Sequence, residues 1–188
     1  MAVLPICIIG ETVLHSTAAE VAVINDAVRE LVITLFATME AAPGVGLAAP
    51  QVGVDARIFV YDWTDDDGVR WRGVAINPEL LVSPPSVDDL DEENEAEGCL
   101  SVPGERFPLR RSQRAVLRAL NLEGEAYEID ATGWLARIFQ HEYDHLDGVL
   151  YTDRLAHPFD RAAAKIIRKR SWGSPGQSWL PGRDHLDD

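Results

Sequence analysis

Hydrophobic positions recur with a helical period near the start of the chain. Between residues 25 and 40, apolar side chains lie three and four positions apart, at Val28, Leu31, Val32, Leu35, Phe36 and Met39. This spacing predicts an amphipathic helix that Pro43-Gly44 would stop. A short apolar segment, from Ile6 to Ile9, precedes the helix.

The middle of the chain carries strand patterns. The stretches ARIFVYDW (56–63) and RGVAINPEL (72–80) predict two strands, which a polar turn around Asp65 to Gly68 separates. The stretch RAVLRALNLEGEAYEID (114–130) predicts a hairpin that turns near Glu123-Gly124. The middle of the chain is therefore expected to be mostly β.

Two helices are predicted in the last third. One runs from about Gly133 to Asp147, with Thr132 as its N-cap and Gly148 at its end. The other is expected from Pro158 to Arg170, and the tail over about 171–188 shows no clear periodicity.

Length and charge narrow the class of protein. The 188 residues suit a single domain over 1–188. Residues 88–97, DDLDEENEAE, hold seven acidic residues in ten and follow SPPS, which predicts an exposed acidic loop over about 83–97. A net charge of −14, from 31 acidic and 17 basic residues, disfavours broad binding to nucleic acid phosphates, so we expect no DNA partner.

The cysteines and the first residues bear on the compartment. Cys7 and Cys99 are too few for a disulfide framework, although a single bridge between them stays open. The start, MAVLPICIIGE, lacks a basic leading segment, is interrupted by Pro5 and is too short to span a bilayer. We therefore expect a cytoplasmic protein without a signal peptide or a membrane helix.

The first of the two late helices carries QHEYDHLDG, residues 140–148. One face holds Ile138, His141, Glu142 and His145, beside an apolar stripe of Phe139, Tyr143 and Leu146, and the remaining face holds Arg137, Gln140, Asp144 and Asp147. Imidazoles four residues apart can bind one metal ion, and the glutamate lies beside them without being a ligand. Solvated polar side chains, or two histidines hydrogen-bonded in the core, would show the same spacing.

A third ligand would decide the kind of metal site. The extension HExxHxxGxxH of one metallopeptidase group fails at Tyr151, and no glutamate follows Glu142 to act as a later ligand. The later candidates form no ligand pattern; they include Asp147, Asp153, Asp160, His157 and His185. Upstream, Cys99 in EGCLS offers a thiolate and would leave one position open for water, although a lone cysteine is more often a small buried residue.

The stretch GVGLAAPQ, residues 44–51, lacks the lysine of a nucleotide-binding loop. Its glycines would let a substrate backbone approach closely, and the amide of Gln51 could donate a hydrogen bond there. A glycine turn packed against a helix would look the same.

In this order, GVGLAAPQ, EGCLS and QHEYDHLDG resemble the three motifs of the peptide deformylase family, over roughly residues 4–155. The resemblance implies an α+β fold, with mainly antiparallel sheets packed around a central HExxH-bearing helix and with an N-terminal and a C-terminal helix. It also implies a metal-dependent hydrolase that removes the N-formyl group from the N-terminal formylmethionine of new polypeptides and releases formate. The acidic loop and the tail depart from the short family members.

The resemblance also implies roles for single residues. Cys99, His141 and His145 would bind one divalent metal ion per chain, Fe²⁺ in the cell, with Zn²⁺, Ni²⁺ or Co²⁺ as replacements. Glu142 would be the acid/base.

The oxyanion donors implied by the resemblance are the Gln51 side-chain amide and the Leu100 backbone N–H. The methionine side chain would lie against Val45, Gly46 and Ile138, and Ile138 equally suits a plain core position. Arg106 in SVPGER matches an arginine near the substrate chain in bacterial relatives, and it equally suits a solvated surface.

The expected partners are N-formylmethionyl peptides, and we expect a monomer that binds no membrane. Transient ribosome contact would use the basic residues of the last helix, Arg161, Lys165, Arg168, Lys169 and Arg170, which a solvated basic face would also explain. Two alternatives remain at this point: a metalloendopeptidase with the same HExxH site, and a non-catalytic metal-binding module whose site a fourth protein ligand closes.

Overall fold

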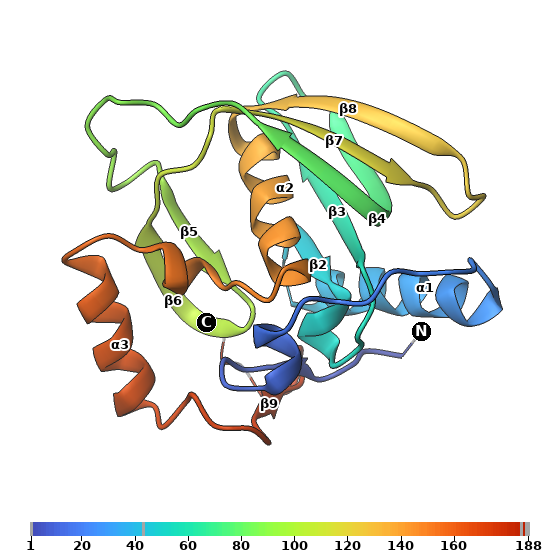
Figure 1. Cartoon of the computed structure of the whole chain (residues 1–188). Coiled ribbons are helices and arrows are strands. Elements are labelled where there is room, and N and C mark those ends of the chain that lie inside the picture. Colours follow the sequence, from blue (N-terminus) through green and yellow to red (C-terminus); the bar gives the residue numbers. More distant parts are fainter. Residues whose placement is uncertain (1, 43, 185, 187–188) are drawn as a thin grey trace.

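The computed structural model describes residues 2–42, 44–184 and 186, and Figure 1 shows its arrangement. Pro43 and His185, named above as part of a helix stop and as a candidate ligand, lie outside the described residues. All strand pairs are antiparallel. Together with the helices they form the expected α+β fold, and no described helix is long and apolar enough to cross a membrane.

The largest sheet has five strands in the order β2-β3-β4-β7-β8. Its strands are β2 (Gly46–Ala48), β3 (Ile58–Thr64), β4 (Arg70–Val82), β7 (Arg114–Leu120) and β8 (Ala126–Thr132). The two predicted strands and the predicted hairpin are thus confirmed. The β7–β8 turn is built on Asn121, whose side-chain oxygen accepts the backbone N–H groups of Glu123 and Glu125.

Helix α2 (Gly133–Leu146) lies between this sheet and the two-stranded β5–β6 sheet, as Figure 1 shows. Its apolar stripe packs on the large sheet, where the ring of Phe139 meets that of Tyr61 edge-on with centroids 5.0 Å apart. On the other side, strand β5 (Ala96–Cys99), which pairs with β6 (Val102–Pro108), supplies the polar partners of its histidines. The helix therefore lies at the centre of the core.

The remaining face of α2 is not a solvated one. Arg137, Gln140 and Asp144 are all buried, and only Asp147 is exposed. Gln140 bridges to the backbone of Ser112, accepting its N–H and donating to its carbonyl. Burial on every side requires each of these polar groups to find a partner within the protein.

The acidic loop departs from the expectation at its end. Residues up to Asn94 include mostly exposed positions, but Glu97 lies in β5 and is 4% exposed. The strand explains this burial, because Glu97 and Cys99 are two residues apart and therefore share the face that looks toward α2.

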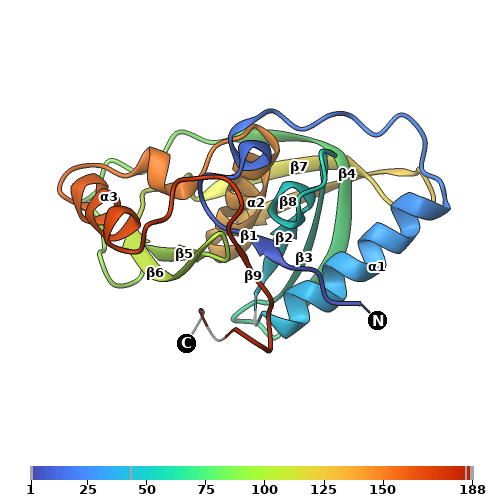
Figure 2. The same cartoon turned by 90° about the horizontal axis from the view of Figure 1, so that it is seen from below.

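The first and last strands of the described residues lie side by side. Helix α1 (Asp26–Ala41) begins where the side chain of Asn25 caps the N–H of Val28, and helix α3 covers Phe159–Lys169. Beyond α3, strand β9 (Ser178–Trp179) pairs with β1 (Ile6–Cys7), and Figure 2 shows the two strands together. The tail without periodicity thus contributes a short strand. Both Cys7 and Cys99 are free thiols.

Candidate active site

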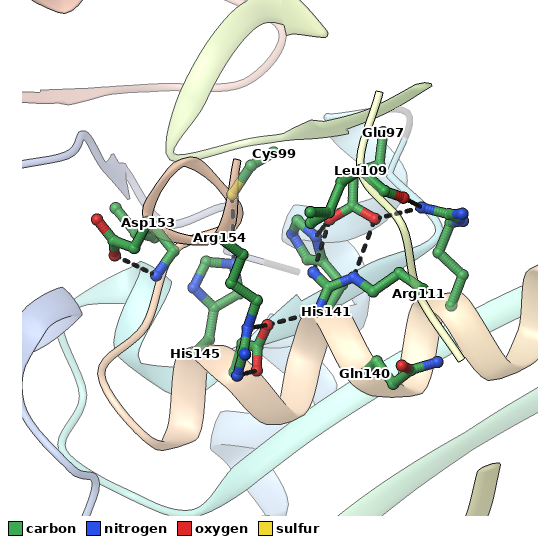
Figure 3. Close-up of polar contacts among 12 residues, drawn as sticks. Glu97, Cys99, Leu109, Arg111, Gln140, His141, His145, Asp153 and Arg154 are labelled. Atoms are coloured by element: carbon green, nitrogen blue, oxygen red, sulfur yellow. Dashed lines mark hydrogen bonds and ion pairs between the residues drawn. The ribbon is translucent and has the colours of Figure 1, made fainter. Parts of the chain in front are cut away.

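Three candidate ligands converge where β5 faces α2. Cys99, His141 and His145 each offer one ligand atom, and these atoms lie within 4.8 Å of one another. The Sγ of Cys99 is 3.3 Å from Nε2 of His145, and the two imidazole rings stand nearly perpendicular, with centroids 5.0 Å apart. Figure 3 shows Cys99 reaching toward the histidines from the opposite element. This is the only such group among the described residues.

The donor set fits a catalytic divalent metal ion. Thiolate and imidazole ligands suit borderline-soft cations, and three protein ligands leave one coordination position for water or substrate. Burial lowers the pKa of His145 well below its ordinary value, which keeps a ring nitrogen free of a proton to bind metal. The side chains of the later candidates Asp147, Asp153, Asp160 and His157 do not join the group.

Glu97 contacts His141 and orients its ring. Its Oε1 lies 3.1 Å from Nδ1 of His141, and its two oxygens also accept from Arg111 and Arg137. These partners outweigh burial, which alone would raise the pKa of Glu97, and hold it below its ordinary value. An ionised carboxylate at Nδ1 fixes the ring and leaves Nε2 to face a metal.

The charge network extends along α2 beyond Glu97. Asp144 accepts from Arg111 at 2.6 Å and from Arg154 at 2.6 and 2.7 Å. Arg137 also donates to the carbonyl of Leu109, at 2.7 Å. Figure 3 shows Glu97, Arg111 and Arg154 of this network beside the helix. The buried arginines are thereby compensated, as buried charges must be.

Glu142 lacks such compensation. Its Oε2 is buried without a hydrogen-bond partner among the described residues, and burial raises the pKa of its carboxyl to about 7. Strand β2 passes so close that a Cβ on Gly46 would lie 2.3 Å from Oε1 of Glu142. A glycine at position 46 therefore leaves room for the carboxylate where it lies, and a carboxylate of this pKa can both accept and return a proton near neutral pH.

Two candidate donors flank Cys99. Gln51 is 1% exposed; its Oε1 accepts the N–H of Ala48 at 2.9 Å, which turns Nε2 toward the hydroxyl of Ser101 (3.3 Å) and the Sγ of Cys99 (3.7 Å). Leu100 follows Cys99 in the turn between β5 and β6. The structure thus brings both candidate oxyanion donors to Cys99, one of the three candidate metal ligands.

A cavity of about 570 Å³ opens over the site. All four candidate substrate residues line it, together with Glu142, Gln51, Leu100 and two of the candidate ligands; the four are Val45, Gly46, Arg106 and Ile138. Arg106 is exposed and donates to the carbonyl of Ala96 at 2.8 Å. Such a volume accommodates a side chain and part of a peptide backbone.

The cavity residues that sequence reasoning did not assign to the site include Glu97, Trp63 and Trp134. The alternation of β5 could have identified Glu97, since it lies two positions before Cys99. Trp134 lies seven positions before His141 on α2, a spacing that keeps it on the same helical face. Trp63 comes from β3, and its ring faces that of Trp134 with centroids 6.3 Å apart. No local signal pointed to Trp63.

Comparisons with known proteins agree with this geometry. The sequence model of the polypeptide deformylase family matches residues 3–160. The chain is 48% identical to peptide deformylase 2 of Corynebacterium efficiens, over 98% of this chain and 96% of that one, and 47% identical to the peptide deformylase of Mycobacterium marinum, over 97% and 96%. The structure is similar to that of a Synechococcus elongatus peptide deformylase in complex with actinonin, with a TM-score of 0.77, 33% identity, and coverage of 90% and 88%. None of these similarities supports a metalloendopeptidase or a non-catalytic metal-binding module.

Proposed function

The chain belongs to the polypeptide deformylase family, and we propose that six of its residues carry out the removal of the formyl group from the N-terminal methionine of new polypeptides. They comprise the metal ligands Cys99, His141 and His145, the acid/base Glu142, and the oxyanion donors Gln51 and Leu100. The observation that carries the proposal is the convergence of three ligand atoms within 4.8 Å beside the uncompensated carboxylate of Glu142.

Cys99, His141 and His145 would hold the ion. A divalent ion in this site supplies Lewis acidity, which lowers the pKa of water and polarises a carbonyl oxygen. Glu97 keeps the ring of His141 in the orientation that its ligand role requires. For the identity of the ion we propose Fe²⁺, with Zn²⁺, Ni²⁺ or Co²⁺ as replacements, because a Cys/His₂ donor set suits all of these cations.

Glu142 moves the proton. Its carboxylate accepts a proton from the attacking water as the formyl carbon becomes tetrahedral, and it then returns that proton to the departing amine. The amide of Gln51 and the N–H of Leu100 donate to the oxygen on which negative charge develops. In other enzymes, losing one such donor costs about 10²–10³ in rate.

The wall for the methionine side chain is formed by Val45, Gly46 and Ile138. Trp134 lines the same cavity from one turn before Ile138, on the same face of α2. The exposed guanidinium of Arg106 stands at the cavity where the peptide chain would continue. A cavity with apolar walls and a few polar groups at the reacting end accounts for a peptide substrate with an N-terminal methionine.

We propose that the whole chain acts as one catalytic domain and as a monomer in the cytoplasm, where new polypeptides emerge. Transient ribosome contact through α3 is supported by its exposed basic side chains at Arg161, Lys165, Arg168, Lys169 and Arg170. Neutralising these side chains should lower co-sedimentation with ribosomes without changing hydrolysis of a short peptide. Unchanged co-sedimentation would dispose of this contact.

The deciding experiment is deformylation of formyl-Met-Ala by anaerobically purified protein, with metal analysis of the same sample. We expect about one metal ion per chain and release of formate. Cys99→Ala should lose both most of the metal and most of the activity. Metal retained at the wild-type stoichiometry in that variant would require a different third ligand, whereas a wild-type protein that bound metal but released no formate would contradict the assigned chemistry.

A further inference from the structure

The C-terminal tail reaches the loop that carries Cys99. Trp179 in β9 is 1% exposed, and its indole N–H donates to the carbonyl of Leu100 at 2.8 Å. The pairing of β9 with β1, in which Ile6 stands opposite Trp179, holds the indole there. Trp179 lies beyond residues 3–160, the part of the chain that the family's sequence model matches.

The hydrogen bond from Trp179 fixes the plane of the Leu100–Ser101 peptide group. The Leu100 carbonyl and the Ser101 N–H belong to the same peptide group, and in a planar trans peptide they point in opposite directions. On the carbonyl side lies the indole of Trp179; on the N–H side lies the Sγ of Cys99, 3.4 Å from the nitrogen of Ser101. A donor on one side and an acceptor on the other together set the rotation of this plane.

Two further contacts fix the backbone of the tail between Gly173 and Gln177. The Oε1 of Glu11 accepts the backbone N–H groups of Gly176 and Gln177. Gly10 has a φ of +111°, and a Cβ there would lie 2.3 Å from the carbonyl carbon of Gly173, so the tail backbone can cross at this position only over a glycine. These contacts fix the backbone that leads to Trp179, and they therefore fix the position of its indole.

We propose that Trp179 is a positioning residue for the reaction. Its indole holds the Leu100–Ser101 peptide so that the Ser101 N–H stays on the Cys99 thiolate, and so that the adjoining Leu100 N–H stays aimed at the substrate oxygen. A hydrogen bond to a thiolate withdraws electron density from sulfur and changes what it donates to a metal. The inference rests on the proposed roles of Cys99 and Leu100.

The test compares two Trp→Phe variants of the full chain, loaded with Co²⁺. Trp179→Phe removes the N–H donor and keeps an aromatic ring. Trp172→Phe is the matched control, because Trp172 lies in the same tail and contacts Arg170 at the end of α3. Three quantities are measured: kcat and KM for formyl-Met-Ala, the thiolate-to-cobalt charge-transfer band, and the thermal unfolding midpoint.

For Trp179→Phe we expect kcat to fall about tenfold with KM nearly unchanged, the size expected when one aligning hydrogen bond is lost near the reacting atoms. The charge-transfer band should shift as well, since the environment of the thiolate changes. Trp172→Phe should keep the wild-type kcat and band. Wild-type kcat and an unshifted band in a folded Trp179→Phe protein would overturn the inference.

If Trp179→Phe does not fold, 3-benzothienylalanine at position 179 retains the bicyclic shape and lacks only the N–H, and the same two outcomes decide. The wild-type spectrum separates this inference from the proposed function. A wild-type protein without a thiolate-to-cobalt band would overturn the role of Cys99, and the role of Trp179 with it. If the wild-type protein shows the band, an unshifted band together with a wild-type kcat in the protein without the N–H would overturn the role of Trp179 alone.

Discussion

Replacing Glu97 by glutamine tests how the protein orients its proposed metal ligands. The substitution keeps the shape of the side chain but removes its charge and turns one acceptor oxygen into a donor. That change affects the 3.1 Å contact with Nδ1 of His141 and the hydrogen bonds from Arg111 and Arg137. We expect two separable losses, one in folding stability and one in metal affinity.

The stability loss follows from the burial of the network. Arg111 and Arg137 are 5% and 6% exposed, and removing one partner of a buried ion pair costs about 3–5 kcal/mol. Both arginines keep a second carboxylate, on Asp144 and Glu95 respectively, so about 3 kcal/mol is the better figure. For a chain of this length, about 3 kcal/mol lowers the unfolding midpoint by about 6–12 °C.

The loss of metal affinity follows from the contact between Glu97 and Nδ1 of His141. An outer hydrogen bond to a metal-ligating histidine is worth about 10–100-fold in metal affinity, which chelator competition measures directly. Asp144→Asn is the matched control, since Asp144 bonds the same Arg111 at 2.6 Å. It should lower the unfolding midpoint similarly and leave the metal dissociation constant roughly unchanged. Equal loss of metal affinity in both variants would refute the reasoning, because general loosening of the network would then explain it.

Three further substitutions test the site. Glu142→Gln should keep metal at the wild-type stoichiometry and lose about 10²–10⁴ in kcat, as expected for a proton-transfer residue; full activity would contradict that role. Gly46→Ala places a Cβ 2.3 Å from Oε1 of Glu142, so the carboxylate must move; we expect kcat to fall at least about tenfold with metal content unchanged, and a wild-type kcat would show that the close approach is dispensable. Trp134→Ala should shift the ratio of kcat/KM for formyl-Met-Ala and formyl-Phe-Ala by about tenfold toward the larger side chain, whereas an unchanged ratio would place Trp134 outside the side-chain pocket.

The helix that carries the motif was predictable because its signals are local. The spacing of His141 and His145, the apolar stripe and the terminal Gly148 all lie within one element, and α2 ends at Leu146, close to the expected position. The third candidate ligand was predicted in a different way. Cys99 lies 46 positions from His145. The chemistry of its thiolate made it a candidate, and the ordered resemblance of three motifs implied that it is the third ligand.

The features that escaped prediction depend on distant partners. An acidic run is typical of a solvated loop, and nothing near Glu97 indicates that Arg111 and Arg137, 14 and 40 positions away, surround it. The polar face of α2 is ambiguous for the same reason. Trp179 belongs to a two-residue strand, which is too short to show any alternation. Alternation within a strand can indicate that a position faces inward, but it does not indicate which groups of a remote segment lie opposite that position.

The buried polar groups of α2 fall into two sets, those with a hydrogen-bond partner among the described residues and those without one, and the two sets correspond to structural and proposed catalytic roles. Arg137, Gln140 and Asp144 are buried with partners, whereas Oε2 of Glu142 and Nδ1 of His145 are buried without one among the described residues. Leaving a buried polar group unpaired costs free energy, so a fold retains it only where other interactions compensate. The paired network provides that compensation, and its burial strengthens the electrostatic interactions within it. The unpaired groups of α2 are therefore concentrated at the residues assigned to proton transfer and metal binding.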